Sequence, residues 1–254
     1  MEKFIDIPNL PKKDVSLVVV DGRIPKVIEE NFYNLNVKII KTEKIGTYDA
    51  ISYHPDVMLH HLGKNKIVVA PNVCQKFVYK LEDEGFKIIL GKLPVGEKYP
   101  SSVLYNVARI GNFAVCNKKY TDEVLLDELY KEKVKIIDVK QGYCKCSICI
   151  VNEKSIITSD IGIYKKVINE GLSCLLIRPG YVTLEGLNYG FIGGATGLIS
   201  KNVLAFYGNI DSHPDGDTIK SFLLNNNVIW RQLYEGSLLD FGTIIPLKEY
   251  CIVE

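Results

Sequence analysis

The stretch LLDFGTIIPL, residues 238–247, predicts a β-strand near the end of a chain of 254 residues, with no helix after it. The other predicted strands of its kind each stand in front of a strand–helix–strand segment. A strand without such a segment needs a partner elsewhere, because an unpaired edge is a liability for a folded protein. Which part of the chain it pairs with decides the fold.

The rest of the chain repeats one unit, a strand followed by an amphipathic helix and a second strand. The first strand occurs as LVVVDG (17–22), IVVAPN (67–72), FAVCNK (113–118), SIITSD (155–160) and VLAFYG (203–208). The second strand occurs as VKIIKT (37–42), FKIILG (86–91), VKIIDV (134–139), LSCLLIRP (172–179) and VIWRQL (228–233). Between them, apolar residues recur at three- and four-residue spacing. A repeat of this order predicts a repeat architecture.

A leading strand precedes the unit in four cases: YDAISYHPDVML (48–59), SSVLYNVARI (101–110), GYCKCSICIV (142–151) and YGFIGGATGLI (189–199). The first unit has no leading strand. If residues 238–247 supply it, the repeats close into a ring and the open edge disappears. We therefore predict an α/β fold, a closed ring of five ββαβ units forming one domain over residues 1–254. The predicted units are 238–247 with 14–42, then 48–91, 101–139, 142–179 and 189–233.

Composition and charge narrow the class of protein. The 31 basic and 30 acidic residues nearly cancel, which does not favour binding to nucleic acid or to an anionic membrane. The first residues, MEKFIDIPNLPKKDV, do not read as a signal peptide, and no stretch approaches the ~20 apolar residues that span a bilayer. Seven cysteines without a secretion signal are expected to be reduced thiols in a cytoplasmic protein.

The predicted architecture resembles the pentein fold, the five-bladed α/β propeller of the guanidine-modifying enzymes. That family includes arginine deiminases, dimethylarginine hydrolases, amidinotransferases and a non-catalytic ribosome anti-association factor. Four local motifs also resemble an uncharacterised bacterial branch of the fold, mainly from clostridia: HPDVMLHHLG, QGYCKCSICIV, YGFIGGATG and HPDGDTI. The resemblance implies a site on the ring axis, lined by the leading strand of each unit.

The cysteine-rich stretch GYCKCSICIV places three of the seven cysteines within six positions. On an extended strand, side chains alternate between faces, so Cys144 and Cys146 would point one way and Cys149 the other. Three sulfurs would then not reach one ion, and we predict no metal and no cofactor. Cysteine is also common as a small apolar core residue, which is the alternative interpretation of the stretch.

The position of these residues within the repeat implies a candidate site. By the quasi-symmetry of the pentein fold, equivalent positions of different units meet at the axis, and they are His54, Asp56, Cys146, Ser147, Thr196 and Asp240. Cys146 would act as nucleophile and His54 as general acid and base, with Asp56 or Asp240 as the partner of His54 or of a cationic substrate. Alternatively, these small and polar residues fill the axis with hydrogen bonds and have no chemistry.

The sequence departs from the catalytic pattern of the family at two places. Where the enzymes carry a cysteine on the last strand, this chain has Ile244 and Ile245, and where several carry Glu-Gly-Gly it has Ile192 before Gly193 and Gly194. The family's His-x-Asp matches His54 to Asp56, and a second HPD, His213 to Asp215, is expected to lie in a loop and helix cap.

Two functions follow. The favoured one is a binding protein without the usual guanidine-hydrolase residues, whose ligand is a small nitrogenous metabolite or a protein partner, possible homodimers included. The alternative is a hydrolase or transferase acting on a small guanidino or amide compound through Cys146 and His54. The candidate ligand-binding residues are Ser147, Thr196, Asp240, Gly193, Gly194, His213 and Asp215.

Overall fold

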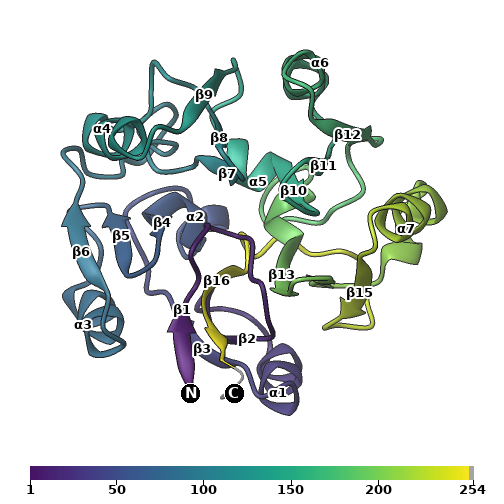
Figure 1. The fold of residues 1–254 in the computed structure, drawn as a ribbon, viewed down its shortest axis with the longest axis horizontal. Helices are drawn as coiled ribbons and strands as arrows, with labels where there is room; N and C mark the ends of the chain where they lie inside the picture. The colour runs from purple at the N-terminus through teal and green to yellow at the C-terminus, as the bar shows by residue number, and fades with distance from the viewer. Residues whose placement is uncertain (252–254) are drawn as a thin grey trace.

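The computed structural model describes residues 1–251, which form an α/β fold with five small sheets (Figure 1). In each sheet an antiparallel strand pair is followed by a parallel pair, whose crossover carries a helix. These helices lie at the rim in Figure 1. They are α1 (Lys26–Asn34), α3 (Gln75–Asp83), α4 (Glu123–Lys131), α6 (Ile161–Asn169) and α7 (Gly216–Asn225).

The sheets have four or three strands each. The four-stranded sheet contains, in order, β1 (Glu2–Phe4), β16 (Ile245–Tyr250), β2 (Val15–Val20) and β3 (Lys38–Lys41). The second sheet contains β4 (Leu59–Gly63), β5 (Lys66–Val69) and β6 (Lys87–Leu90). The third contains β7 (Ala108–Ile110), β8 (Phe113–Cys116) and β9 (Lys135–Asp138). The fourth contains β10 (Ile148–Ile150), β11 (Ser155–Thr158) and β12 (Ser173–Leu176). The fifth contains β13 (Thr196–Ser200), β14 (Val203–Phe206) and β15 (Ile229–Gln232).

The end of the described chain pairs with its beginning. β16 runs antiparallel to β2, with Ile245 opposite Val19, and β1 pairs with the other edge of β16. The predicted pairing of the last strand with the first unit is therefore observed. Over residues 1–251 the sheets nevertheless remain five separate sheets rather than one closed sheet. Residues 252–254 of the predicted domain lie outside the described residues.

The last strand begins later than predicted, at Ile245 instead of residue 238. The segment before it makes its backbone hydrogen bonds with other units, since Asp240 N donates to Thr183 O and Ile244 N to Thr196 O. Gly242 has φ 69°, a left-handed conformation that interrupts a strand. The prediction of a strand over 238–244 was wrong because these partners are remote in sequence.

Three predicted leading strands begin instead with a short helical turn. These turns are α2 (Pro55–Met58), α5 (Cys144–Ser147) and the 3-10 helix η2 (Gly193–Ala195), and each runs directly into the first strand of its sheet. A further 3-10 helix, η1 (Asp49–Ile51), precedes α2, and η3 (Ile210–Ser212) precedes α7. Proline suits the first turn of a helix, which accounts for α2. The extended geometry predicted for Cys144 and Cys146 was therefore wrong, whereas Cys149 lies in β10 as predicted.

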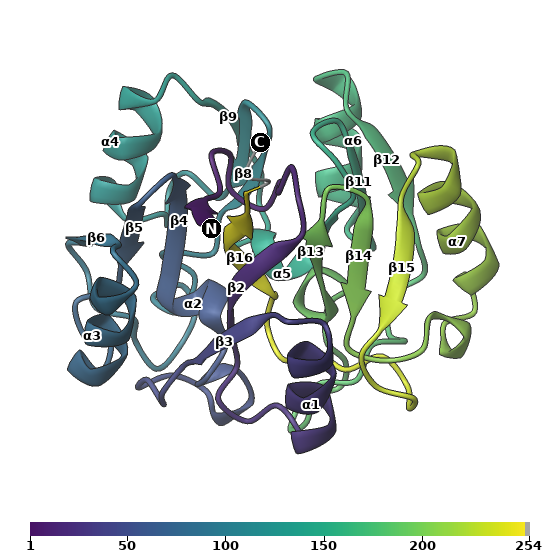
Figure 2. The same cartoon turned by 60° about the horizontal axis from the view of Figure 1, so that its bottom comes forward.

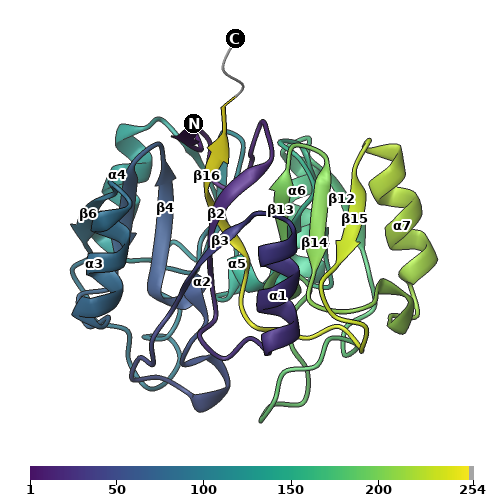
Figure 3. The ribbon, with the colours of Figure 1, turned by 90° about the horizontal axis from the view of Figure 1, so that it is seen from below.

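The packing follows the predicted periodicity. All six residues of β2 are buried, as expected for a strand covered on both faces, and α1 buries Ile28 and Phe32. Helices α4 and α6 each begin after an aspartate, Asp122 or Asp160, whose side chain accepts two backbone N–H groups. Figures 2 and 3 show α3 and α7 at opposite flanks with the strands between them. Among residues 1–251, no helix combines the length and apolar character needed to cross a membrane.

Candidate functional site

The short turns α2, α5 and η2 bring the candidate residues together. Figure 1 shows α2 and α5 near the middle of the molecule, away from the helices at the rim. η2 packs tightly on α5, because a Cβ on Gly193 would lie 2.4 Å from the carbonyl oxygens of Lys145 and Ile148. A Cβ on Gly194 would lie 1.9 Å from Asp240 Oδ1. The two glycines are thus needed for close approach.

Cys146 lies on α5 with only 2% of its surface exposed. Its Sγ donates a hydrogen bond to Asp56 Oδ2 at 3.2 Å and accepts one from Asn106 Nδ2 at 3.1 Å. The Asn106 Oδ1 accepts the backbone N–H groups of Lys145 and Cys146, at 2.7 and 3.2 Å, and so fixes the turn. Burial, together with the charges of Asp56 and Asp240, raises the pKa of Cys146 well above its usual value.

Asp56 is a buried partner of the thiol and of several other polar groups. Its Oδ2 also accepts hydrogen bonds from Thr243 N at 3.0 Å and from Thr243 Oγ1 at 2.7 Å. The buried Lys145 donates from Nζ to the same Thr243 Oγ1 at 3.2 Å. Burial lowers the pKa of Lys145 to about 8, against the opposing effect of Asp56. A chain of polar groups thus connects Cys146, through Asp56 and Thr243, to a buried amine.

His54 is fully buried between two carboxylates. Its Nε2 lies 3.9 Å from Asp21 Oδ2, and its Nδ1 lies 3.8 Å from Asp240 Oδ1. Neither ring nitrogen has a hydrogen-bond partner among the described residues. Asp21 is paired with Arg23, whose Nη2 donates to Oδ2 at 2.7 Å. Both ring nitrogens therefore remain available for a hydrogen bond to a bound molecule.

The three predicted catalytic residues come together. A ring nitrogen of His54, a carboxylate oxygen of Asp56 and the Cys146 sulfur all lie within 4.8 Å of one another. They are also the described residues that could hold a metal ion, because nitrogen, oxygen and sulfur together form a ligand set that zinc accepts. The prediction that no metal binds assumed an extended strand and three sulfurs, and that reasoning does not apply to α5.

A pocket of about 720 Å³ opens over Cys146, His54 and Asp240, which lie at its buried floor. We call it the site pocket. Its walls are mostly apolar and aromatic, and they consist of Tyr48, Ile51, Tyr99, Tyr143, Leu184, Leu187, Tyr189 and Phe191, with Lys140, Gln141 and Gly142 at one side. The rings support one another, since Tyr143 stacks on Phe191 with 6.4 Å between centroids.

Asp240 is the acidic residue that lines the site pocket. Its oxygens accept the backbone N–H groups of Phe191 at 2.8 Å and Gly242 at 2.9 Å. No lysine or arginine of residues 1–251 forms an ion pair with it, and the titratable side chain beside it is His54. Burial raises the pKa of Asp240 despite the opposing effect of His54. A carboxylate without a cationic partner at the base of a pocket favours a cationic ligand.

The remaining predicted residues have other surroundings. Neither Ser147 nor Thr196 lines the site pocket. Ser147 Oγ is buried without a hydrogen-bond partner among the described residues, and Thr196 Oγ1 donates to Ile192 O. His213 and Asp215 form a separate cluster at the start of α7, where Asp215 Oδ1 accepts from Arg178 Nη2 at 2.7 Å. Asp215 is at the N-cap position of α7 but its side chain makes no capping hydrogen bond. The structure therefore does not bring His213 and Asp215 to the site pocket.

Sequence reasoning missed three buried residues of the site, which are Asn106, Lys145 and Asp21. Asn106 precedes β7 at the place that the HPD motif occupies before β4, so its position in the repeat could have indicated it. Asp21 ends the first strand of its unit, where a polar residue reads as a turn signal. The aromatic wall was not predicted as such, because its residues come from several loops.

These features place the chain in a class: the α/β fold with several small sheets matches structures of the pentein type. Within it, the chain belongs to the family described as "Family of unknown function (DUF6873)", whose model matches residues 19–245. No curated protein sequence matches it.

Solved structures with this fold include three enzymes. SxtG, an amidinotransferase of saxitoxin biosynthesis from Microseira wollei, has 10% identity and a TM-score of 0.57 over 90% of this chain and 91% of that one. Agmatine deiminase from C. jejuni has 12% identity and a TM-score of 0.55, over 95% and 98%. The DDAH of Pseudomonas aeruginosa has 8% identity and a TM-score of 0.54, over 87% and 92%. At such identities the likeness shows the fold alone.

Proposed function

We propose that the site pocket binds a small, planar, cationic nitrogen compound of the guanidino or amidino class. The observation that carries this proposal is the buried carboxylate of Asp240, which lines the pocket without an ion-pair partner from a lysine or arginine of residues 1–251. An amidinium or guanidinium group offers a planar pair of N–H donors that matches a carboxylate. The ligand would thus supply the positive charge that the floor lacks.

The walls and the size of the site pocket support the same class of ligand. The tyrosine and phenylalanine faces at Tyr48, Tyr143, Tyr189 and Phe191 attract a cation through their ring quadrupoles. The volume of about 720 Å³ suits a metabolite rather than a polymer. One structural neighbour is an agmatine deiminase with substrate bound, and agmatine carries a guanidinium group.

The proposal is tested by comparing a cationic ligand with a neutral ligand of nearly the same shape. Isothermal titration should show binding of benzamidine and agmatine, and at least tenfold weaker binding of the neutral benzamide. Asp240→Asn should weaken benzamidine binding by roughly ten- to a hundredfold, the effect of one charged hydrogen bond. Asp127→Asn, at an exposed carboxylate on α4, should leave it unchanged. EDTA in all buffers removes any contribution of a metal.

Equal binding of benzamidine and benzamide, or no binding of either, would contradict the proposal. A protein partner, a second copy of the chain included, would then be the better hypothesis. Light scattering on the purified protein between micromolar and millimolar concentration tests for a homodimer directly.

A second candidate function is thiol-dependent hydrolysis or transfer, with Cys146 as nucleophile and His54 as general acid and base. The observation that favours it is the mutual distance of at most 4.8 Å between Cys146 Sγ, a His54 nitrogen and an Asp56 oxygen. The thiolate would attack the amidino carbon, and ammonia or an amine would leave with a proton from His54. Water or a second amine would then displace the sulfur.

This reaction requires the Cys146 thiol to lose its proton. Because the pKa of Cys146 is raised, the thiolate would form when a bound cation offsets the charges of Asp56 and Asp240. Agmatine incubated with the protein should release ammonia, and Cys146→Ser should abolish release while it retains ligand binding. Cys149→Ser, at a buried thiol that does not line the site pocket, is the matched control. Binding without ammonia release or a covalent adduct would leave the protein a binding protein.

We also propose that the five units form a closed ring, with the last strand completing the first unit. The β16–β2 pairing and the hydrogen bond from Cys251 N to Met1 O, at 2.8 Å, support this arrangement. A circular permutant that links residue 251 to residue 1 and opens between β10 and β11 should fold with a melting temperature within a few degrees of the parent. An unfolded permutant would count against a ring.

A further inference from the structure

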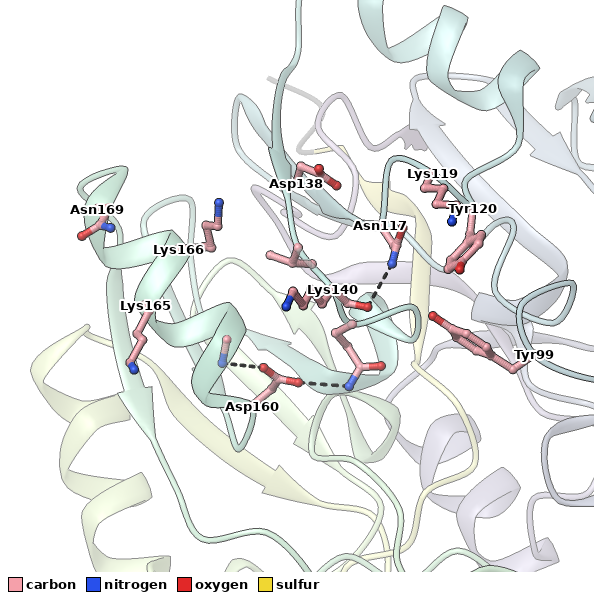
Figure 4. Close-up of a pocket in the computed structure, with 13 residues that line it drawn as sticks. Tyr99, Asn117, Lys119, Tyr120, Asp138, Lys140, Asp160, Lys165, Lys166 and Asn169 are labelled. Atoms are coloured by element: carbon pink, nitrogen blue, oxygen red, sulfur yellow. Dashed lines mark hydrogen bonds between the residues drawn. The ribbon is translucent and has the colours of Figure 1, made fainter.

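A second cavity, of about 810 Å³, lies beside the site pocket. It is bounded by residues 117–120, by residues 138–141 and by helix α6, so it lies between the third and fourth units (Figure 4). We call it the lysine cavity, because four lysines line it: Lys119, Lys140, Lys165 and Lys166. It shares Tyr99, Lys140 and Gln141 with the site pocket.

The four lysines are not neutralised by the protein. Within residues 1–251 none of them forms an ion pair, whereas the nearby Lys131 and Lys135 pair with Glu128 and Glu170. Lys119 lies over the ring of Tyr120, with 5.2 Å from Nζ to the ring centroid. These four exposed lysines line one cavity without an acidic partner among the described residues, so a bound anion would find several cations within reach.

The two aspartates of the lysine cavity are engaged with other groups. Asp160 accepts the backbone N–H groups of Gly162 and Ile163 at 2.7 and 2.9 Å, and the Gln141 Nε2 at 3.0 Å. Asp138 Oδ1 accepts the backbone N–H of Lys118 at 2.9 Å. With four lysines and two aspartates, the lining carries a formal charge of +2 (4 − 2) in a chain whose net charge is +1.

Local structure holds the lysine cavity in shape. Asn117 Nδ2 donates to Lys140 O at 2.9 Å, which fixes residues 138–141 to the end of β8, as Figure 4 shows. On α6, Lys165, Lys166 and Asn169 follow Gly162 at three-, four- and seven-residue spacing, so they share a side of the helix. The basic groups thus come from three segments that border one cavity: residues 117–120, residues 138–141 and α6.

We propose that the lysine cavity binds the phosphate group of a small molecule. Lysine binds phosphate as a mobile point charge, and a dianion would neutralise the formal excess of two positive charges. The side-chain amides of Asn117 and Gln141 each use one N–H within the protein and have a second N–H to donate. Because the charge is confined to one cavity and flanked by two aspartates, it suits a small ligand rather than an extended polyanion.

The test uses inorganic phosphate and pyrophosphate on the full chain, at constant ionic strength set with chloride. We expect pyrophosphate to bind in isothermal titration and to raise the melting temperature. Lys140→Gln combined with Lys166→Gln should weaken binding at least tenfold. The control is Lys87→Gln combined with Lys154→Gln, at two exposed lysines without ion pairs outside the lysine cavity, and it should bind as the parent does.

Two outcomes would overturn the proposal: no binding beyond that of chloride, or equal loss in the control variant. A twelve-nucleotide single-stranded RNA that binds more tightly than pyrophosphate, and is weakened by both lysine pairs, would indicate a nucleic-acid surface instead. Asp240→Asn should leave pyrophosphate binding intact, so failure here is distinguishable from failure of the proposed cation site.

Discussion

The thiol of Cys146 donates its hydrogen bond to Asp56 Oδ2, 3.2 Å away, so a carboxylate holds the proton that a nucleophile has to lose. This contact explains why the pKa of Cys146 is raised by Asp56 as well as by burial. It also couples the thiol to the ligand, because a cation beside Asp240 would lower the same pKa. The site thus has a resting state in which the sulfur is protonated.

Thiol labelling tests this resting state. At pH 8, iodoacetamide should label Cys146 much more slowly than the half-buried Cys251, because the thiolate reacts and Cys146 has little of it. Asp56→Asn should accelerate labelling of Cys146, since removing the negative charge lowers its pKa, by up to about tenfold per pKa unit. Peptide mass spectrometry after timed quenching measures both rates, with Asp127→Asn as control. An unchanged rate in a folded Asp56→Asn protein would rule out the charge effect.

The fold was predictable to the extent that it depends on local periodicity. The five strand–helix–strand units follow from apolar spacing within each unit, and the partner of the last strand follows from counting strands. The turns α2, α5 and η2 were not predictable in this way. α5 depends on the side chain of Asn106, 40 residues before Cys146, and η2 depends on the absence of a side chain at Gly193.

The site was predictable in part, through repeat position and family resemblance. His54, Asp56 and Cys146 were grouped because they occupy equivalent places in different units, and they lie within 4.8 Å of one another. Lys145 was missed because a strand would have turned it away from the axis, whereas in the turn its Nζ reaches Thr243. His213 was included because its HPD motif repeats the first one, although its contacts are with Arg178.

Two glycine-to-alanine substitutions test whether η2 needs a residue without a side chain at Gly194. Gly194→Ala should destabilise the protein by about 1–3 kcal/mol or more, because its Cβ would lie 1.9 Å from Asp240 Oδ1. Gly46→Ala, where nothing lies within 4 Å of the added Cβ, should change stability by less than about 0.5 kcal/mol. Urea unfolding of both variants measures the difference. Equal stability would mean that η2 can move away from Asp240 without cost.

Two buried histidines predict a loss of stability in acid. Burial lowers the pKa of His60 to about 3 and that of His61 to about 4, from the ordinary value of 6.5. The unfolded chain therefore binds more protons than the folded chain below pH 6.5, and stability falls with pH until about pH 4. From pH 7 to pH 5 the two should cost about 4 kcal/mol together.

Urea unfolding at the two pH values checks this loss. His60→Gln should reduce it by about 2 kcal/mol, because one of the two proton-binding differences is gone. A loss of the same size in this variant would assign the acid sensitivity to other groups.

The buried Lys145 should make the protein more stable as the pH rises above about 8. Burial lowers its pKa from 10.5 to about 8, so the amine loses its proton at a lower pH in the folded state than in the unfolded state. Below pH 8 both states hold the proton and the full cost of burying the charge, roughly 3 kcal/mol, is present. Between about pH 8 and 10.5 the unfolded state binds more protons, so this cost disappears as the pH rises.

Lys145→Met removes the titrating group, and the comparison with the parent isolates its effect. The stability of the variant relative to the parent should fall by about 2 kcal/mol between pH 7.5 and pH 9.5, as the parent is relieved of its buried charge. Lys154→Met, at an exposed lysine without an ion pair, should show no such change. If the difference between Lys145→Met and the parent stays constant over this range, the amine has an ordinary pKa. The polar chain from Cys146 through Asp56 and Thr243 would then end at a lysine that keeps its proton up to about pH 10.5 rather than about pH 8.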